Sequence, residues 1–407
     1  MKKIKFTAYE GPMPKDWNKF RESDYENPEC INDEQYGYLK EGGFTGVIAL
    51  LERTREQGER GLKYAEKYGL EYYVRNEINW DENYDPELFE KNAYEYNAYK
   101  SYSSFAGMFI CDEPNCEKYG ALAAMKKGFD KFFDNKPYGF FVNLLPTYAN
   151  DVTQLGADYP DYIARYAQTV STAFICFDHY PFMKNESGDY TRGDYLYNLK
   201  VVADACDKNG RDLWTFVQSS NFCKRKTEID YAALSFQIMA CLAYGSKNLI
   251  YYTYWTWPGY YAAEREKKFN PALVLSSGER TWKYFDAKRI HAFVNLFGEI
   301  IANSSRKRTY LLKGVPSIFK GADEETSEKI KSDGAMLVGE FLTKDNKIAY
   351  LIVNAEDPYA KKYTQVSVGV KGEIYTLNGK YAVSEESEIT LGAGEGVFVV
   401  ENKNSQS

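Results

Sequence analysis

Short apolar runs rich in aromatic and β-branched residues recur through the first two thirds of the chain. Eight of them predict strands, at 4–9, 44–50, 70–78, 105–113, 138–146, 172–181, 212–220 and 248–257. Segments between them have apolar residues at helical spacing and predict helices, among them 120–134, 161–171, 193–210 and 230–245. Strands without polar alternation, each followed by a helix, are typical of a parallel sheet covered by helices. Eight such units predict an α/β fold, a (β/α)8 TIM barrel.

The pattern changes after residue 303. The segment SSRKRT, at 304–309, is polar and predicts a linker. Beyond it, apolar runs at 335–343, 347–354, 364–370, 372–378 and 396–402 are separated by short turn sequences, without helical spacing between them. We therefore predict a barrel domain at 1–303 and a small C-terminal antiparallel β-sandwich at 304–407. The second domain is expected to pack against the barrel for stability or to mediate contacts in a homo-oligomer.

Length and charge limit the classes of partner. A chain of 407 residues suits a barrel of about 250 to 300 residues plus a smaller domain. Acidic residues outnumber basic ones by 58 to 51, so the net charge of −7 offers no general attraction for nucleic acid. No run reaches the roughly 20 apolar residues of a membrane span, so we expect no membrane partner. The N-terminus lacks a signal peptide, which predicts a cytoplasmic chain, although a chain whose signal had been removed would read the same.

Cysteine and histidine usage favours a chain without a bound metal. The seven cysteines are odd in number and lie mainly within apolar runs, which predicts reduced, buried side chains. They show no metal-site spacing, and the chain has two histidines, which is unfavourable for a catalytic zinc site. We therefore expect no metal and no cofactor.

Polar and aromatic residues follow every predicted strand, and a barrel brings strand ends together on one face. These residues are Glu10, Glu52, Arg53, Arg75, Asn76, Glu77, Trp80, Asp112, Glu113, Asn143, Tyr148, Asp178, His179, Tyr180, Gln218, Tyr254, Trp255 and Trp257. They include no lysine nucleophile and no glycine-rich phosphate loop. Aromatic rings suit the apolar faces of a sugar, amides and acids suit its hydroxyls, and a carboxylic acid can protonate a glycosidic oxygen. We therefore expect a carbohydrate substrate.

Two acids, Asp112 and Glu113, stand side by side where the fourth strand ends. Adjacent side chains point in different directions, so one can work as an acid while the other orients a neighbour or a substrate substituent. Their mutual repulsion also helps to keep a proton on one of them at neutral pH. A purely structural interpretation is that Asp112 caps the helix after Pro114 and that Glu113 pairs with Arg75.

The sixth and eighth strands end in further candidates. His179 follows Asp178 and can either hydrogen-bond a sugar hydroxyl, orient a carboxylate, or be a satisfied buried histidine. An aromatic run such as YYTYWTW is more often part of a hydrophobic core than of a binding site. Trp255 and Trp257 lie past the strand, however, so we expect one of them to stack on the sugar.

The motifs GMFICDEPN, VNLLPTY, FDHYPF, WTFVQSS and LAYGSKNLIYYTYW, taken in this order, resemble the clan A glycoside hydrolases, nearest the family 42 β-galactosidase-like barrels. The resemblance covers the barrel part of the chain, although each motif is short. It implies an acid/base glutamate after strand four, which is Glu113 here, with Asp112 in place of the usual asparagine. It also implies a glutamate nucleophile after strand seven, where this sequence has Gln218.

An amide cannot act as the carboxylate nucleophile, and three interpretations follow. Asp178 takes the second role, as a nucleophile at roughly 5.5 Å from the acid or as a base at roughly 6.5 to 9.5 Å. Alternatively, the Asp112–Glu113 pair resembles the family 20 and family 123 hexosaminidases, in which the substrate's N-acetyl group is the nucleophile, the Glu is the acid and the Asp steers the acetamide. Third, Gln218 is an engineered replacement of a glutamate.

The sequence therefore predicts a glycoside hydrolase with Glu113 as general acid and Asp178 as the favoured second carboxylate. The residues expected to bind the sugar are Asp112, His179, Tyr180, Asn143, Gln218, Tyr254, Trp255, Trp257, Arg75 and Glu77. Two other classes stay open. Gln218 favours a barrel that binds glycans without cleaving them, and the His179–Tyr180 pair is the one feature that suits a lyase or isomerase.

Overall fold

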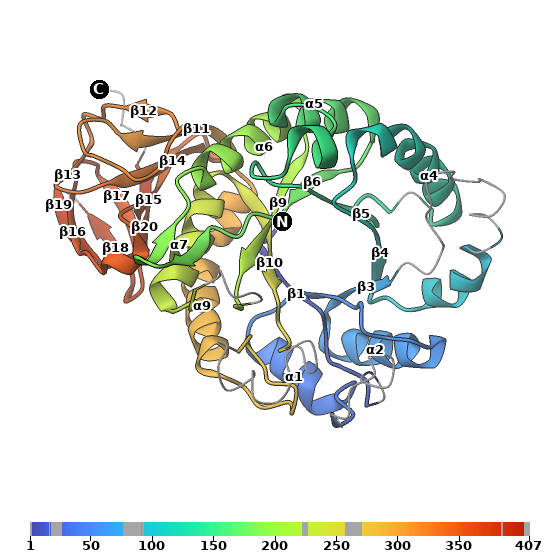
Figure 1. Ribbon diagram of the computed structural model, residues 1–407. Helices are drawn as coiled ribbons and strands as arrows, with labels where there is room; N and C mark the ends of the chain where they lie inside the picture. Colours follow the sequence, from blue (N-terminus) through green and yellow to red (C-terminus); the bar gives the residue numbers. More distant parts are fainter. Residues whose placement is uncertain are drawn as a thin grey trace.

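Eight parallel strands close into a barrel, in the order β1-β10-β9-β6-β5-β4-β3-β2 (Figure 1). The computed structural model describes residues 2–15, 17, 27–75, 91, 93–134, 136–221, 227–256, 271–383 and 386–402. The barrel strands are β1 (Lys5–Tyr9), β2 (Gly46–Ile48), β3 (Glu71–Arg75), β4 (Phe105–Asp112), β5 (Phe140–Leu144), β6 (Phe174–Phe177), β9 (Asp212–Gln218) and β10 (Ser246–Tyr252). All eight fall on predicted runs, so the predicted (β/α)8 barrel is confirmed.

Helices form an outer ring around these strands (Figure 1). They are α1 (Asp33–Glu41), α2 (Arg55–Tyr68), α4 (Tyr119–Phe132), α5 (Tyr159–Thr169), α6 (Tyr195–Asn209), α7 (Tyr231–Ala243) and α9 (Trp282–Ala302). Local sequence sets their ends: the Thr54 side chain accepts a hydrogen bond from the Gln57 N–H at the start of α2, and Gly69 and Gly210 have left-handed backbone after α2 and α6. Among the helices described, none combines the length and the apolarity that crossing a bilayer requires.

The barrel interior is filled with side chains. Trp214 stacks on Phe174 with ring centroids 3.7 Å apart, and Tyr73 and Phe141 meet its ring edge-on. Cys176 belongs to the same cluster, and the six cysteines in the described part of the chain are free and buried, as predicted. The barrel interior is therefore a packed core, and in barrels of this kind the ligand site lies at the C-terminal ends of the strands.

A short hairpin follows β6 and was not predicted. It consists of β7 (Phe182–Asn185) and β8 (Gly188–Thr191), paired antiparallel. Its sequence is polar and lacks the apolar alternation that marks a strand.

Two further sheets occupy the C-terminal part of the chain. The strands are β11 (Ser305–Leu312), β12 (Glu324–Glu325), β13 (Ile330–Ser332), β14 (Met336–Leu342), β15 (Ile348–Asn354), β16 (Thr364–Val368), β17 (Gly372–Thr376), β18 (Gly379–Val383), β19 (Ser387–Leu391) and β20 (Gly396–Glu401). Seven form one sheet, ordered β12-β11-β14-β15-β20-β17-β18, and three form another, ordered β13-β16-β19. One hydrophobic cluster contains Val338 and Ile352 from the larger sheet and Val366 and Leu391 from the smaller one.

The predicted linker at 304–309 is wrong, because β11 begins at Ser305 and pairs with β14. Charged side chains of this strand form ion pairs in the folded structure, so their polarity does not indicate a loop. The Arg306 guanidinium lies 2.6 Å from carboxylate oxygens of both Asp204 and Asp207 on α6. The strand thus joins the larger sheet to the helical ring, and the Thr309 hydroxyl adds a 2.9 Å hydrogen bond to the carbonyl of Ala243 in α7.

Candidate active site

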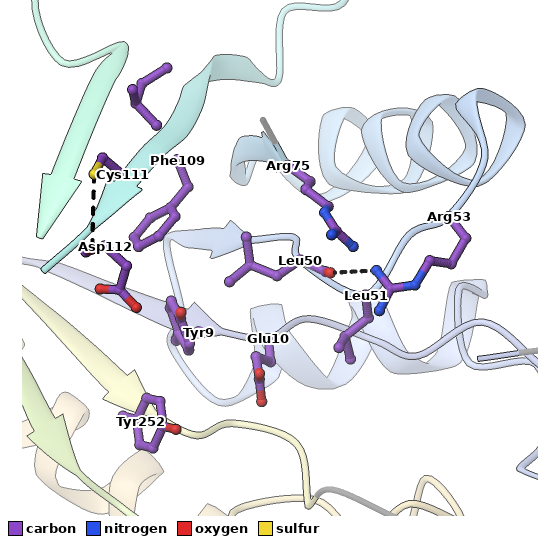
Figure 2. A pocket seen from close by; sticks show the side chains of 11 residues that line it. Tyr9, Glu10, Leu50, Leu51, Arg53, Arg75, Phe109, Cys111, Asp112 and Tyr252 are labelled. Carbon is purple, nitrogen blue, oxygen red and sulfur yellow. Dashed lines mark hydrogen bonds between the residues drawn. The ribbon is translucent and has the colours of Figure 1, made fainter. Parts of the chain in front are cut away.

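A pocket of about 430 Å³ opens at the C-terminal ends of the barrel strands, within the roughly 300 to 1,000 Å³ typical of ligand sites. The described residues that line it are Tyr9, Glu10, Leu50, Leu51, Arg53, Arg75, Phe109, Ile110, Cys111, Asp112 and Tyr252 (Figure 2). The rings of Tyr9 and Tyr252 lie with centroids 5.4 Å apart and those of Tyr9 and Phe109 5.7 Å apart. The pocket therefore combines an aromatic base with charged walls.

Asn143 holds the acids of strands four and six together. Its Nδ2 donates to Asp112 Oδ1 at 3.0 Å and to Asp178 Oδ1 at 3.2 Å. Its backbone carbonyl accepts a 2.9 Å hydrogen bond from the Glu113 N–H. The Glu113 carboxyl interacts electrostatically with the carboxyls of both Asp112 and Asp178. Three carboxyl groups thus form one cluster, as the predicted meeting of strand ends requires.

The acids of this cluster differ in access. Asp112 and Glu113 can be reached from solvent at the mouth of the barrel, although protein surrounds most of each carboxyl. Asp178 is buried. Burial raises the pKa of all three, since it penalises the charged form.

Charge repulsion adds to burial. The pKa of Glu113 is raised to about 7, by burial and by the Asp112 charge, against a lowering by its interaction with Asp178. The pKa of Asp178 is raised well above its usual value, by burial first and then by Glu113 and Asp112. Two acids in such contact titrate as a pair, and this pair retains a proton near neutral pH.

Two purely structural roles were considered for the adjacent acids: a helix cap for Asp112 and an ion pair with Arg75 for Glu113. Neither is found among the described residues. The cap of the helical turn at 116–118 is Asn115, whose side chain accepts from the Glu117 N–H at 2.9 Å, so Asp112 is free of that task. Among the described residues Glu113 forms no ion pair with Arg75, and the groups that act on it electrostatically are Asp112 and Asp178. Glu113 also has φ of 50°, a left-handed conformation that costs a non-glycine residue about 1 to 3 kcal/mol and concentrates at functional sites.

His179 orients a second acid. Its buried side chain places Nε2 3.5 Å from Asp194 Oδ1, and Arg192 Nε donates to the same carboxylate at 3.0 Å. These partners lower the pKa of Asp194, against the opposing effect of its burial. Tyr148 lies over this group, with its ring 4.9 Å from His179 and 4.5 Å from the Arg192 guanidinium carbon. His179 does not line the pocket, so the orienting role fits better than a contact with sugar.

Gln218 does not face the pocket as expected. It is fully buried, and its Oε1 accepts a 3.2 Å hydrogen bond from the backbone N–H of Phe182, which begins β7. Its main chain is bound on both sides by the Gln237 side chain, at 2.7 and 2.9 Å. The amide therefore fastens the chain after β6 to the end of β9.

The predicted aromatic platform is also misplaced. Tyr254 and Trp255 are fully buried, and the Tyr254 ring packs against Phe44 at 5.1 Å, outside the barrel strands. The reason is that the strand ends at Tyr252, so the residues after it leave the inner face of the barrel. Tyr180 is buried against Tyr252, with rings 5.0 Å apart. The remaining expected residues, Asn76, Glu77, Trp80 and Trp257, lie outside the described residues.

The site includes further residues that were not among the predicted ones, among them Tyr9, Tyr252, Arg192 and Asp194. The two tyrosines could have been found from strand alternation, because each lies on the inner face of its strand near the C-terminal end. Nothing in the sequence around Arg192 and Asp194 indicates that this pair meets His179.

Comparisons with known proteins identify the fold. No protein-family model matches the sequence, and no curated protein matches it. A β-galactosidase from Bacillus circulans sp. alkalophilus is 8% identical, with a TM-score of 0.60 over 98% of this chain and 99% of that one. A GH30 endoxylanase from Clostridium papyrosolvens is 11% identical, with a TM-score of 0.50 over 99% and 97%. At such identities the likeness establishes the architecture of the barrel and not the reaction.

Proposed function

We propose that this chain is a glycoside hydrolase and that Glu113 is its general acid. The observation that carries the proposal is the Glu113–Asp178 pair, with the pKa of Glu113 raised to about 7, beside a pocket of aromatic and charged residues. A general acid works best when its pKa lies near the working pH. The fold shared with a β-galactosidase and an endoxylanase supports the same class. The motifs quoted above favour the family 42-like barrels within it.

The geometry favours Asp112 over Asp178 as the second carboxylate. The two acids of a glycosidase stand roughly 5 to 9.5 Å apart, on either side of the bond that breaks. Asp178 is buried and is not among the described residues that line the pocket, so a substrate bound there does not reach it directly. We therefore assign Asp178 the role of a positioning residue, linked to Asp112 through the shared donor Asn143. Asp112 lines the pocket and can reach the substrate.

Two roles suit Asp112, and one experiment separates them. It can steer an acetamido group of the substrate, or it can act directly as nucleophile or base. Hydrolysis of a panel of p-nitrophenyl glycosides would be measured, comparing N-acetylhexosaminides with galactosides, glucosides and fucosides. Cleavage confined to N-acetylhexosaminides supports substrate assistance, and cleavage of plain glycosides supports the direct role. If the chain cleaves no glycoside, the proposal is refuted.

We expect the activity to fall as the pH rises through about 7. The pKa of Glu113 is raised to about 7, so its acid form is present below that pH and is lost above it. The value of kcat/KM should therefore decline tenfold per pH unit on the alkaline side, with a single proton lost. The initial rate at low substrate concentration, measured from pH 5 to 9, gives this profile. A rate independent of pH between 6 and 8.5 would exclude the pair as the proton donor.

A barrel that binds glycans without cleaving them is the second candidate function, and Gln218 favours it. If position 218 were the site of a lost nucleophile, Gln218→Glu would restore cleavage by several orders of magnitude. We expect less than a tenfold change in kcat/KM, because the side chain is fully buried and bonded to Phe182 rather than turned to the pocket. The variant and the wild type would be compared on the same panel of glycosides. A large gain in kcat/KM in the variant would show that position 218 is the site of the nucleophile.

The two C-terminal sheets are interpreted as a β-sandwich that braces the barrel. Residues of both sheets share one hydrophobic cluster. Contacts with α7 are close, since the Ser235 hydroxyl donates to the carbonyl of Gly394 at 2.9 Å. This role fits a domain boundary near residue 303 and needs no ligand of its own.

A further inference from the structure

Two arginines form one wall of the pocket. Figure 2 shows Arg53 and Arg75 on the side opposite Asp112, with Leu50 between the two sides. They follow β2 and end β3, which are neighbouring strands. Arg53 Nη1 donates to the carbonyls of Leu50 and Glu52, at 3.2 and 3.3 Å, which fixes its side chain at the rim. The pocket therefore has an acidic side and a cationic side.

The charge of Arg75 is not matched by a carboxylate at this wall. Arg75 is exposed, and it makes no ion pair with any residue that the structure describes. The acid that acts on it electrostatically is Glu52, whose carboxyl is buried and accepts a hydrogen bond from the Tyr72 hydroxyl. Burial raises the pKa of Glu52 to about 7, so this acid is only partly charged at neutral pH. Within the described part of the chain, the guanidinium of Arg75 is therefore exposed in the pocket and has no carboxylate partner.

A guanidinium presents a planar fork of N–H donors that matches the oxygens of a carboxylate, sulfate or phosphate, and it keeps its charge at any physiological pH. Neutral sugar hydroxyls do not require such a group, because amides and acids bind them as well. The start of α2, capped by Thr54 directly after Arg53, adds the positive end of a helix dipole on the same side. The charge of this wall suits an anionic ligand.

We propose that Arg75 and Arg53 bind an oxyanion on the substrate, so that the enzyme acts on an acidic glycan, with a uronate carboxylate or a sulfate ester next to the sugar that is cleaved. This inference rests on the proposed function. In the sheet, Arg75 pairs with Phe109, three residues before Asp112. At about 3.3 Å per residue this places the two groups about 10 Å apart along the strands. A short glycan can touch both.

The test is a binding measurement that needs no turnover. Isothermal titration calorimetry with the Glu113→Gln variant would compare methyl β-glucuronide with methyl β-glucoside, which differ only at the carboxylate. Glucose 6-sulfate and glucose form a second pair. Because one charge-assisted hydrogen bond accounts for about a 10- to 100-fold change in affinity, we expect the acidic member of at least one pair to bind that much more tightly. The pair of sugars that shows the preference reveals whether the arginines bind a carboxylate or a sulfate.

Variants then locate the preference. Adding Arg75→Ala should abolish it while leaving the affinity for the neutral sugar within about twofold, and Arg75→Lys should retain only part of it, since an ammonium lacks the planar fork. Arg55→Ala serves as a matched control: it removes the same charge from a side chain that does not line the pocket and instead pairs with Glu59 on α2. This control should leave the preference unchanged.

Three outcomes would overturn the inference: equal affinity within both pairs, no binding of any of the four sugars, or a preference that survives in the Arg75→Ala and Arg53→Ala variants alike. These outcomes differ from failure of the proposed function. A wild-type chain that cleaves only neutral glycosides refutes the acidic glycan but keeps the hydrolase. A chain that binds the acidic sugar through Arg75 and cleaves nothing keeps the arginine site and refutes the hydrolase.

Discussion

A Glu113→Gln variant is expected to hydrolyse glycosides with poor leaving groups about 10² to 10⁴ times more slowly than the wild type. Glutamine has nearly the same shape but carries no acidic proton, so the departing oxygen must leave as an anion. The backbone hydrogen bond from residue 113 to the Asn143 carbonyl does not depend on the side chain and should hold the loop in place. Initial rates with alkyl glycosides measure the loss.

The loss should depend on the leaving group. A glycoside whose leaving group is already a stable anion, such as dinitrophenolate, needs little protonation, so the variant should approach the wild-type rate for it. Glu117→Gln is the matched control, because Glu117 is exposed four residues further on and should leave both rates unchanged. A loss of equal size for good and poor leaving groups would mean that Glu113 has a role other than proton donation.

Replacing Trp214 by alanine is expected to lower the free energy of unfolding by about 3 to 5 kcal/mol. The side chain is 1% exposed in the barrel interior, stacked on Phe174 at 3.7 Å and on Tyr138 at 5.6 Å. Its removal leaves a cavity between strands that cannot close without distorting the barrel. Unfolding in guanidinium chloride, followed by tryptophan-independent circular dichroism, measures the change.

Trp282 provides the matched control, since its side chain is 49% exposed on α9. Trp282→Ala removes the same group from the surface and should change the free energy of unfolding by less than about 0.5 kcal/mol. If both variants lost the same stability, Trp214 could not be the centre of a closely packed barrel interior.

The barrel could be predicted because its strands are continuous apolar runs, which a parallel sheet buried on both faces requires. Elements whose stability depends on residues distant in the sequence could not be predicted. After Ser305, strand β11 has three consecutive basic residues, and one of them, Arg306, forms ion pairs with α6. The hairpin β7–β8 has a polar sequence, and Gln218 helps to fasten its start.

The site shows the same contrast between features that depend on local sequence and features that depend on distant residues. The rule that strand ends converge placed Asp112, Glu113 and Asp178 correctly near one another. That rule gives the end of a strand and not the direction of each side chain. Gln218 was therefore expected in the pocket and is buried, and Trp255, beyond the last strand residue, is buried as well. The partners of Asp178 come from two other strands, so only the folded structure reveals them.

The most direct test of a proton-donating Glu113 is the pH dependence of kcat/KM, measured in parallel for the wild type and for Glu113→Gln with an activated glycoside that both can cleave. We predict that the wild type loses activity above about pH 7 with one proton, and that this decline is absent from the variant, because the group that titrates has been removed. The same decline in both proteins would contradict the assignment of Glu113 as the acid.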